Sequence, residues 1–147
     1  MDIHHVAEQF IAWAKRKIRI HISILEKRVY FHERQVWWVA LGKNVGPETD
    51  GKDTQFHRPV LVLKKYNEHM CFVVPLTTQI KSPSVWYQIP ISFDLKPSVV
   101  NISQGRTISS KRFLRKIAVL NVDDFDTVVL ECTKQFSIPT GSGRDSP

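Results

Sequence analysis

The segment FHRPVLVLKKYNEHMCFVVPLTTQ, residues 56–79, contains two apolar runs with the length and composition of buried strands. The runs are VLVL and CFVVP, and the polar residues between them favour a turn, so the segment is predicted to form a β-hairpin. Arg58 precedes the first strand, and Thr77 and Thr78 follow the second. A permanent cation and paired hydroxyls at the ends of two buried strands are therefore candidates for binding or chemistry.

The sequence on both sides of this hairpin predicts further short strands and a helix near each end of the chain. Residues 3–16 place their apolar side chains on one helical stripe, and no turn residue separates them from 18–25, so we expect one long helix, although 18–24 also alternate as a strand would. The other expected elements are strands at 35–41, 85–91 and 98–102, a polar loop at 42–56, and a helix at 123–135 with Asn121 as its N-cap. Short strands flanked by helices are typical of a small, strongly bent sheet or barrel, so the predicted class is mainly β (α+β).

The 147 residues carry a formal net charge of +7. A chain of this length is most simply one domain, and its charge favours a polyanionic partner: nucleic acid first, an acidic protein segment second and a membrane surface third. No apolar run approaches the ~20 residues of a membrane-spanning helix, and the N-terminus does not resemble a signal peptide. Cys71 and Cys132 are far apart and form no CxxC motif, so we expect reduced cysteines and a cytoplasmic protein.

Several catalytic motifs are absent from the sequence. It has no Walker-type loop, GxGxxG, HExxH or GxSxG, and its six histidines are scattered. Glu48, Asp50 and Asp53 could hold a divalent cation, but a solvated loop explains them more simply. We therefore expect metal-free polar chemistry without a cofactor.

Five segments, taken in order, resemble the MazF/PemK family of toxin endoribonucleases from type II toxin–antitoxin systems. The opening strand and its loop are similar to the family's first strand, and the Arg-Pro of the hairpin and the Pro-x-Thr-x-Gln after it match two further motifs. The remaining two are a Gln-x-Arg-Thr-Ile stretch followed by basic residues, and a last strand with a C-terminal helix. The segments are RQVWWVALGKNVGPE, HRPVLVL, VVPLTTQ, SQGRTISSKR and KIAVLNVDDFDTVV, between about Arg34 and Gln135.

The resemblance implies a fold, an activity and partners. The fold would be a small SH3-like β-barrel with a C-terminal helix, occupying residues 29–138, to which this chain adds a basic N-terminal helix at 1–28 and a flexible tail at 139–147. The activity would be metal-independent cleavage of single-stranded RNA (mRNA) at short sequences, producing 2′,3′-cyclic phosphate and 5′-hydroxyl ends. The partners would be RNA, a second copy in a homodimer, and a cognate antitoxin whose acidic disordered segment blocks the RNA groove.

Arg58 and Thr77 match the family's catalytic arginine and threonine. An arginine remains charged and presents parallel N–H donors that suit the charge building on a reacting phosphate. It holds its proton too tightly to serve as a literal general acid near neutral pH. From the residues alone, Arg58 could equally be a strand-end arginine paired with Glu48, and Thr77 and Thr78 ordinary strand-end hydroxyls.

The sequence departs from the family pattern at the position of the proton acceptor. PemK-like members carry an Arg-x-Asp, and others an acidic residue, just before the glutamine, and those places fall on Asn101 and Ser103 in this chain. Glu48, which matches an acidic loop residue of the family, and His57, whose ordinary pKa lies near neutrality, are the remaining candidates for the base. The catalytic residues expected from the sequence are thus Arg58, Thr77, Glu48 and His57.

RNA binding requires positive charge and flat surfaces for base stacking. Trp37 and Trp38 are adjacent on a predicted strand and must face opposite ways, so that one is core and the other can be exposed. Trp86 and Tyr87 present the same choice. The expected RNA-binding residues are Thr78, Gln79, Ser103, Gln104, Arg106, Lys111 and Arg112, with Arg115, Lys116 and the basic residues of the N-terminal helix nearby.

Two alternatives to an endoribonuclease remain open. The same barrel could be a non-catalytic module that binds RNA or an acidic antitoxin segment, which Asn101 and Ser103 favour. It could also be a topoisomerase-poisoning toxin, although such a toxin has no need of the matched Arg58 and Thr77. The N-terminal helix could contact RNA, the antitoxin or a second subunit.

Overall fold

The predicted hairpin forms the centre of the fold. The computed structural model describes residues 1–24, 28–81, 85–92 and 97–137. Strands β2 (His57–Lys65) and β3 (Met70–Thr77) pair antiparallel, with Val60 opposite Pro75. The Asn67 side chain shapes the turn by accepting hydrogen bonds from the backbone N–H groups of His69 and Met70. Continuing this register by two residues brings Arg58, near the start of β2, level with Thr77, at the end of β3.

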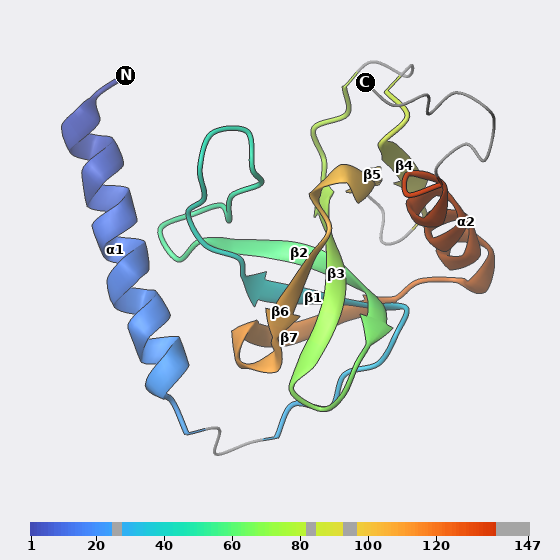
Figure 1. Ribbon diagram of the computed structural model, residues 1–147, viewed down its shortest axis with the longest axis horizontal. Helices are drawn as coiled ribbons and strands as arrows, with labels where there is room; N and C mark the ends of the chain where they lie inside the picture. The colour runs from blue at the N-terminus through green and yellow to red at the C-terminus, as the bar shows by residue number, and fades with distance from the viewer. Residues whose placement is uncertain (25–27, 82–84, 93–96, 138–147) are drawn as a thin grey trace, which may run out of the picture.

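The strands form an antiparallel sheet in the order β4-β5-β3-β2-β1-β7, and β6 pairs with the first half of β3 (Figure 1). In the described part of the chain no ladder joins β6 to β7, so the expected mainly-β fold with two helices is confirmed while closure of the barrel is not seen. The remaining elements are α1 (Ile3–Ile22), β1 (Gln35–Ala40), β4 (Gln88–Ile91), β5 (Ser98–Asn101), η1 (Ile102–Gln104), β6 (Arg106–Ser109), η2 (Ser110–Arg112), β7 (Phe113–Val119) and α2 (Val122–Lys134).

Strand β1 is apolar along its length because both of its faces are covered. Trp37 and Val39 belong to one buried cluster with Phe31 and Phe113, whereas Val36 belongs to a second cluster that includes Val128 of α2. The prediction that the paired tryptophans separate is confirmed.

Trp37 is buried, and Trp38 is only half-buried, with the Arg115 guanidinium 5.9 Å from the centre of its ring.

Asn121 caps α2 by accepting a hydrogen bond from the Asp124 N–H, as expected from the sequence. Cys71 and Cys132 are free and buried, and burial raises the pKa of the Cys71 thiol to about 12.

Helix α1 is shorter than expected and packs on the sheet through one aromatic side chain. It begins after Asp2, which caps it, and ends at Ile22, so the ambiguous segment 18–22 is helical. Trp13 is its one buried residue and packs edge-on against Phe56. Gly42 has φ +106°, and a Cβ there would overlap the Trp13 indole, so a glycine is required for this approach.

The remaining comparisons with the sequence-based expectations concern two strands, the tail and the helices. The predicted strands at 85–91 and 98–102 are shorter than expected, since β4 begins at Gln88 and β5 ends at Asn101. The expected tail, 139–147, lies outside the described residues. None of the helices that the structure describes is long and apolar enough to cross a membrane.

Candidate active site

A pocket of about 190 Å3 lies where the start of β2 meets the end of β3. The antiparallel register that brings Arg58 level with Thr77 also brings strands β4 and β5 alongside, because β5 pairs with the last residues of β3. We call this the Arg58 pocket. Its lining residues are Thr49, Arg58, Pro75, Leu76, Thr77, Gln79, Ile80, Lys81, Gln88 and Asn101.

Arg58 is half-buried and is held in place by backbone carbonyls. Its Nε donates to the carbonyl of Asp50, and its Nη1 donates to that of Leu76 at 3.2 Å. Burial lowers the pKa of Arg58 from its usual value, which the nearby Asp50 partly offsets, and the group stays charged at neutral pH. Within the described residues Nη2 donates to no protein acceptor, so the guanidinium is fixed on two sides and free on one.

The hydroxyl of Thr77 is oriented by the turn that follows β3. Its Oγ1 accepts a hydrogen bond of 3.0 Å from the backbone N–H of Gln79. An accepting hydroxyl keeps its own hydrogen for a second partner. Thr77 can therefore donate to an anion beside Arg58, whereas Thr78 is exposed and does not line the pocket.

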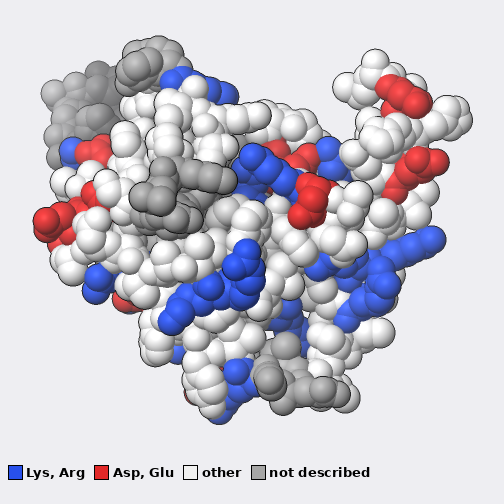
Figure 2. Space-filling view, turned by 180° about the vertical axis from the view of Figure 1, so that it is seen from behind, with Lys and Arg blue, Asp and Glu red and all other residues white. Residues whose placement is uncertain are grey.

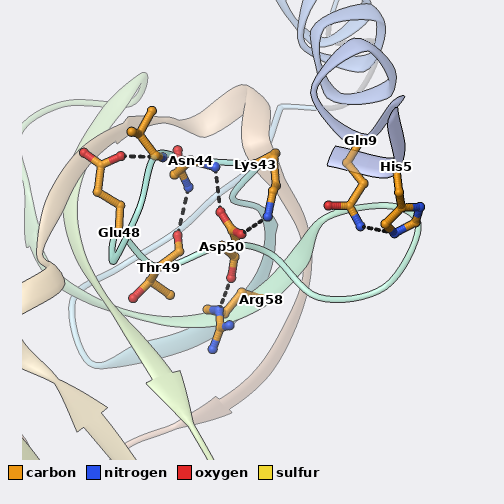
Figure 3. A network of polar contacts seen from close by, with 9 residues as sticks. His5, Gln9, Lys43, Asn44, Glu48, Thr49, Asp50 and Arg58 are labelled. Carbon is orange, nitrogen blue, oxygen red and sulfur yellow. Dashed lines mark hydrogen bonds and ion pairs between the residues drawn. The ribbon is translucent and has the colours of Figure 1, made fainter. Parts of the chain in front are cut away.

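The loop between β1 and β2 is folded around Asp50 (Figure 3). The Asp50 carboxylate accepts from Lys43 Nζ at 2.5 Å and from the backbone N–H of Asn44 at 2.6 Å. The backbone carbonyl of the same residue receives Arg58 Nε. Asp50 thus links the conformation of the loop to the position of Arg58, which makes it a positioning residue that the sequence reasoning did not single out.

The side chains of Glu48 and Gln104, two predicted site residues, form hydrogen bonds with backbone groups of this loop. The Glu48 carboxylate accepts from the Val45 N–H at 2.8 Å and is exposed, on the side of the loop away from Arg58 (Figure 3). Gln104 accepts from the Thr49 N–H at 3.0 Å and donates to the Pro47 carbonyl at 3.3 Å. Neither side chain lines the Arg58 pocket, and no ion pair between Glu48 and Arg58 occurs among the described residues.

His57 lies on the opposite face of β2 from Arg58, because adjacent strand residues point to opposite sides. Its Nε2 is 2.9 Å from Arg16 Nη2 on α1, which requires the imidazole to accept, and its Nδ1 is 3.6 Å from an Asp53 oxygen. Burial lowers the pKa of His57; Asp53 opposes that shift and Arg16 adds to it. The structure does not bring His57 together with Arg58 and Thr77.

The contact between α1 and the sheet, which we call the α1 seam, contains two other predicted RNA-binding residues. Lys111 Nζ donates to the His21 carbonyl at 2.6 Å. Arg112 donates to the carbonyls of Ala40 and Leu41, and its guanidinium lies 5.6 Å from the centre of the Trp13 ring. The α1 seam consists of Trp13, Arg16, His21, Phe56, His57, Lys111 and Arg112.

Ser103 and Arg106 lie between these two regions. Ser103 is exposed and donates to Asn101 Oδ1 at 2.8 Å, so the two residues that stand at the family's Arg-x-Asp positions hydrogen-bond each other. Arg106 is half-buried and contacts Asn44 Oδ1 at 3.5 Å. Of this pair and its neighbours, Asn101 alone lines the Arg58 pocket.

Three polar residues of the pocket were not singled out from the sequence: Thr49, Lys81 and Gln88. Gln88 accepts from the Lys81 N–H at 2.8 Å and donates to the Gln79 carbonyl at 3.2 Å, which ties β4 to the end of β3. Next to it on the chain, Trp86 is 62% exposed and meets Tyr87 edge-on at 5.7 Å. No local sequence signal marks these residues, because β4 reaches the pocket only through its pairing with β5.

The pocket combines a fixed cation, a free hydroxyl and amide groups. None of its described lining residues carries a carboxylate or an imidazole. No group of three or more His, Cys, Asp or Glu side chains that could hold a metal ion occurs within the residues that the structure describes. Such an arrangement can bind an anion and stabilise additional negative charge on it.

Comparisons with known proteins identify the family of this chain. The sequence profile described as "PemK-like, MazF-like toxin of type II toxin-antitoxin system" matches residues 32–136. No curated protein sequence matches the chain.

Solved structures of toxins have the same fold. The Mycobacterium tuberculosis toxin MazF-mt6 is 20% identical, covering 70% of this chain and 96% of that one, with a TM-score of 0.53. An endoribonuclease in complex with its cognate antitoxin from mycobacterial species is 14% identical over 75% of this chain and 100% of that chain, and MazF from Deinococcus radiodurans is 17% identical over 73% and 97%; both have a TM-score of 0.56. At these identities the structures establish the fold, while the profile match spans more than half of the chain. The protein therefore belongs to the family of PemK-like, MazF-like toxins of type II toxin–antitoxin systems.

Proposed function

We propose that this protein is a metal-independent endoribonuclease that cleaves single-stranded RNA at short sequences, with the scissile phosphate in the Arg58 pocket. The observation that carries the proposal is the convergence of Arg58 and Thr77, from neighbouring strands, on one pocket without a described carboxylate. A phosphodiester is the anion of RNA that such a pocket suits, because it accepts from both a guanidinium and a hydroxyl.

In the proposed reaction the 2′-oxygen attacks phosphorus, the P–O5′ bond breaks, and the products carry a 2′,3′-cyclic phosphate and a 5′-hydroxyl. Negative charge builds on the non-bridging oxygens as the new bond forms. The free Nη2 of Arg58 and the hydroxyl of Thr77 would each donate to one of these oxygens. Asp50 and Gln104 contribute by holding the loop and the guanidinium in position.

The proposal assigns removal of the 2′-hydroxyl proton to solvent hydroxide, and a water molecule supplies the proton that the 5′-oxygen acquires. No described lining residue of the pocket carries a carboxylate or an imidazole, and Glu48 and His57 both have protein partners elsewhere. The cleavage rate is then expected to rise about tenfold per pH unit from about pH 6 to 8. A rate that levels off toward neutral pH and does so no longer in His57→Gln would transfer the role to His57, and a rate independent of pH that gains this slope only in Glu48→Gln would transfer it to Glu48.

RNA on either side of the phosphate would cross the surface around the pocket. Exposed Trp86 offers a face for base stacking, and Lys81, which lines the pocket, lies with its Nζ 5.7 Å from the centre of the Tyr87 ring. The net charge of +7 supports attraction of a polyanion. Gln79 and Asn101 would add hydrogen bonds to RNA from the pocket lining.

We further propose that a cognate antitoxin with an acidic segment blocks this surface and that the toxin forms a homodimer. The support is membership of the toxin family and the fold shared with the mycobacterial endoribonuclease solved with its cognate antitoxin. The basic surface suits an acidic chain in the same way as it suits RNA.

The test is incubation of the purified protein with a long single-stranded RNA in EDTA, followed by mapping of the cut sites and their end groups. We expect cyclic phosphate and 5′-hydroxyl ends, at rates lowered about 100-fold in Thr77→Val, which removes one donor while keeping the shape. Thr78→Val, one residue away but outside the pocket, is the matched control and should cleave normally.

Each remaining outcome selects another function. RNA that is bound but uncut would indicate the non-catalytic binding module. Abolition of cleavage by EDTA would exclude the metal-free mechanism, and absence of both binding and cleavage would favour a toxin that acts through protein contacts.

A further inference from the structure

Helix α1 has one face directed at its own sheet. The residues on this face, at spacings of three and four, are the ones that are not fully exposed: Val6, Gln9, Trp13, Arg16 and Ile20. With 3.6 residues per turn these positions lie on one side of the helix. The inward face is therefore narrow and partly polar, and Trp13 is the one residue of it that is buried.

A second apolar face of α1 is exposed on the side of the helix away from Trp13, and two of its residues, Ile11 and Ile18, also line open grooves between α1 and the barrel. Ile3, Ile11, Ile18 and Ile22 are 76%, 55%, 60% and 68% exposed, and Ala7 and Ala14 between them are exposed as well. Figure 1 shows α1 on one flank of the molecule, with nothing described beyond it. We call this face the outer stripe: Ile3, Ala7, Ile11, Ala14, Ile18 and Ile22.

An apolar stripe of this length facing water is the mark of a surface that another molecule covers. It lies outside residues 32–136, which match the family profile, so the barrel does not account for it. Its residues recur at spacings of four and three, which is the spacing by which one helix packs along another.

We propose that the outer stripe binds the outer stripe of a second copy of this chain, with the two α1 helices antiparallel and crossing between Ile11 and Ala14. The proposal does not depend on RNA cleavage. It names a contact that the residues matched by the family profile do not contain.

The shape of the stripe favours the antiparallel arrangement. About this midpoint, Ala7 of one copy lies opposite Ile18 of the other, and Ala14 lies opposite Ile11, so each small side chain faces a large one. Ile3 and Ile22 meet at the two ends. A parallel pair would instead place alanine on alanine and isoleucine on isoleucine at each level, leaving gaps that cost packing energy.

The charge distribution along α1 gives the same direction. Asp2 and Glu8 precede the stripe's midpoint, and Lys15, Arg16, Lys17 and Arg19 follow it. Figure 2 shows acidic atoms toward the tip of the helix and basic atoms below them. In the antiparallel pair Glu8 of one copy falls on the same flank as Lys15 and Arg19 of the other, within about two residues, or ~3 Å, along the axis. A parallel pair would bring the basic halves together.

The geometry leaves both catalytic regions open. Trp13 faces the sheet and the outer stripe faces away from it, so the two barrels would lie on the outer sides of the helix pair. Arg58 points to the face of β2 opposite from His57, which contacts α1. Pairing through α1 therefore does not cover the Arg58 pocket.

The first test is charge exchange in the full-length chain, read by sedimentation at several concentrations. Glu8→Lys alone and the double variant Lys15→Glu/Arg19→Glu alone are each expected to weaken the association through α1 at least tenfold, while the homodimer proposed above from the family fold persists in every variant. Mixed together they should associate as the unchanged protein does, because each opposite-charge contact is restored. These residues are exposed, and circular dichroism checks that the fold is kept.

The second test is cross-linking. After oxidation, a mixture of Ala7→Cys and Ile18→Cys should give a disulfide-linked dimer, whereas neither variant alone should; native Cys71 and Cys132 are buried. Cross-linking of Ala7→Cys with itself would overturn the antiparallel arrangement. Absence of any cross-link together with failure of the charge exchange would overturn the interface. Binding of a protein that stays unpaired to phosphatidylserine vesicles would assign the stripe to a lipid surface.

Discussion

The Arg58 pocket and the α1 seam use similar residues in opposite ways. Adjacent residues at the start of β2 supply both, with Arg58 in the pocket and His57 in the seam. In the seam, Arg16, Lys111 and Arg112 donate to groups of the protein itself. In the pocket, Arg58 Nη2 and the Thr77 hydroxyl have no acceptor among the described residues. A basic residue is therefore a candidate for binding where the fold leaves a donor free inside a pocket, as it does for Arg58.

The contrast between the Arg58 pocket and the α1 seam is tested most directly by removing one half-buried arginine from each region. Arg58→Ala is expected to lower kcat/KM for a short RNA about 1,000-fold, or ~4 kcal/mol, because charge stabilisation at phosphorus is lost. Arg112→Ala should change it less than about threefold, since Arg112 donates to Ala40 and Leu41. An equal loss of kcat/KM in both variants, at unchanged melting temperature, would contradict the different roles given to Arg58 and Arg112.

A second change acts on the seam alone. Trp13→Ala should weaken docking of α1 by about 3 kcal/mol, because Trp13 is its one buried side chain. The measurement is hydrogen exchange of the α1 amides, with His4→Ala, an exposed position on the same helix, as control. If residues 1–28 are a separate unit, as proposed, the amides of the sheet should stay protected from exchange in this variant. Loss of protection in the sheet together with α1 would show that the helix is part of one cooperative fold.

A third change examines the surface beside the pocket. Trp86→Ala is expected to raise KM for RNA about tenfold with little change in kcat, because base stacking contributes about 1–3 kcal/mol per base. Tyr66 is similarly exposed but lies at the turn between β2 and β3, the far end of the hairpin, so Tyr66→Ala should leave KM unchanged. An equal rise in KM for both would point to unspecific loss of aromatic surface.

The smallest expected effect is a pH dependence of the docking of α1. The pKa of His57 is lowered in the fold by burial, so the unfolded or undocked chain binds a proton more readily. The neutral imidazole therefore stabilises the docking of α1 fully above about pH 6.5, and this stabilisation is lost as the pH falls through the lowered pKa. Below that pH a protonated ring would face Arg16, and Asp53 would offset the repulsion in part. We expect tryptic cleavage within α1 to accelerate by a few-fold between pH 7 and 5.5, and this dependence to vanish in His57→Gln.

Much of the fold could be predicted because the local patterns were unambiguous. The hairpin, the N-cap Asn121 and the opposite faces of Trp37 and Trp38 follow from alternation and capping, which act between near neighbours. The same alternation separates His57 from Arg58, although it does not say which face holds the pocket. The end of α1 at Ile22 could not be predicted, since 18–24 satisfy both the helical and the strand pattern.

Residue types and their spacing were enough to identify the family, to select Arg58 and Thr77 as candidates and to show the basic, apolar character of the N-terminal helix. The tertiary structure decided which of the charged residues have partners. Lys111 donates to α1, Arg112 donates to the end of β1, and Glu48 accepts from its own loop, while Gln88 reaches the pocket through the pairing of β4 with β5. The physical reason is that a donor is satisfied by whatever acceptor the folded chain brings within about 3 Å, and long-range pairing of strands sets that distance.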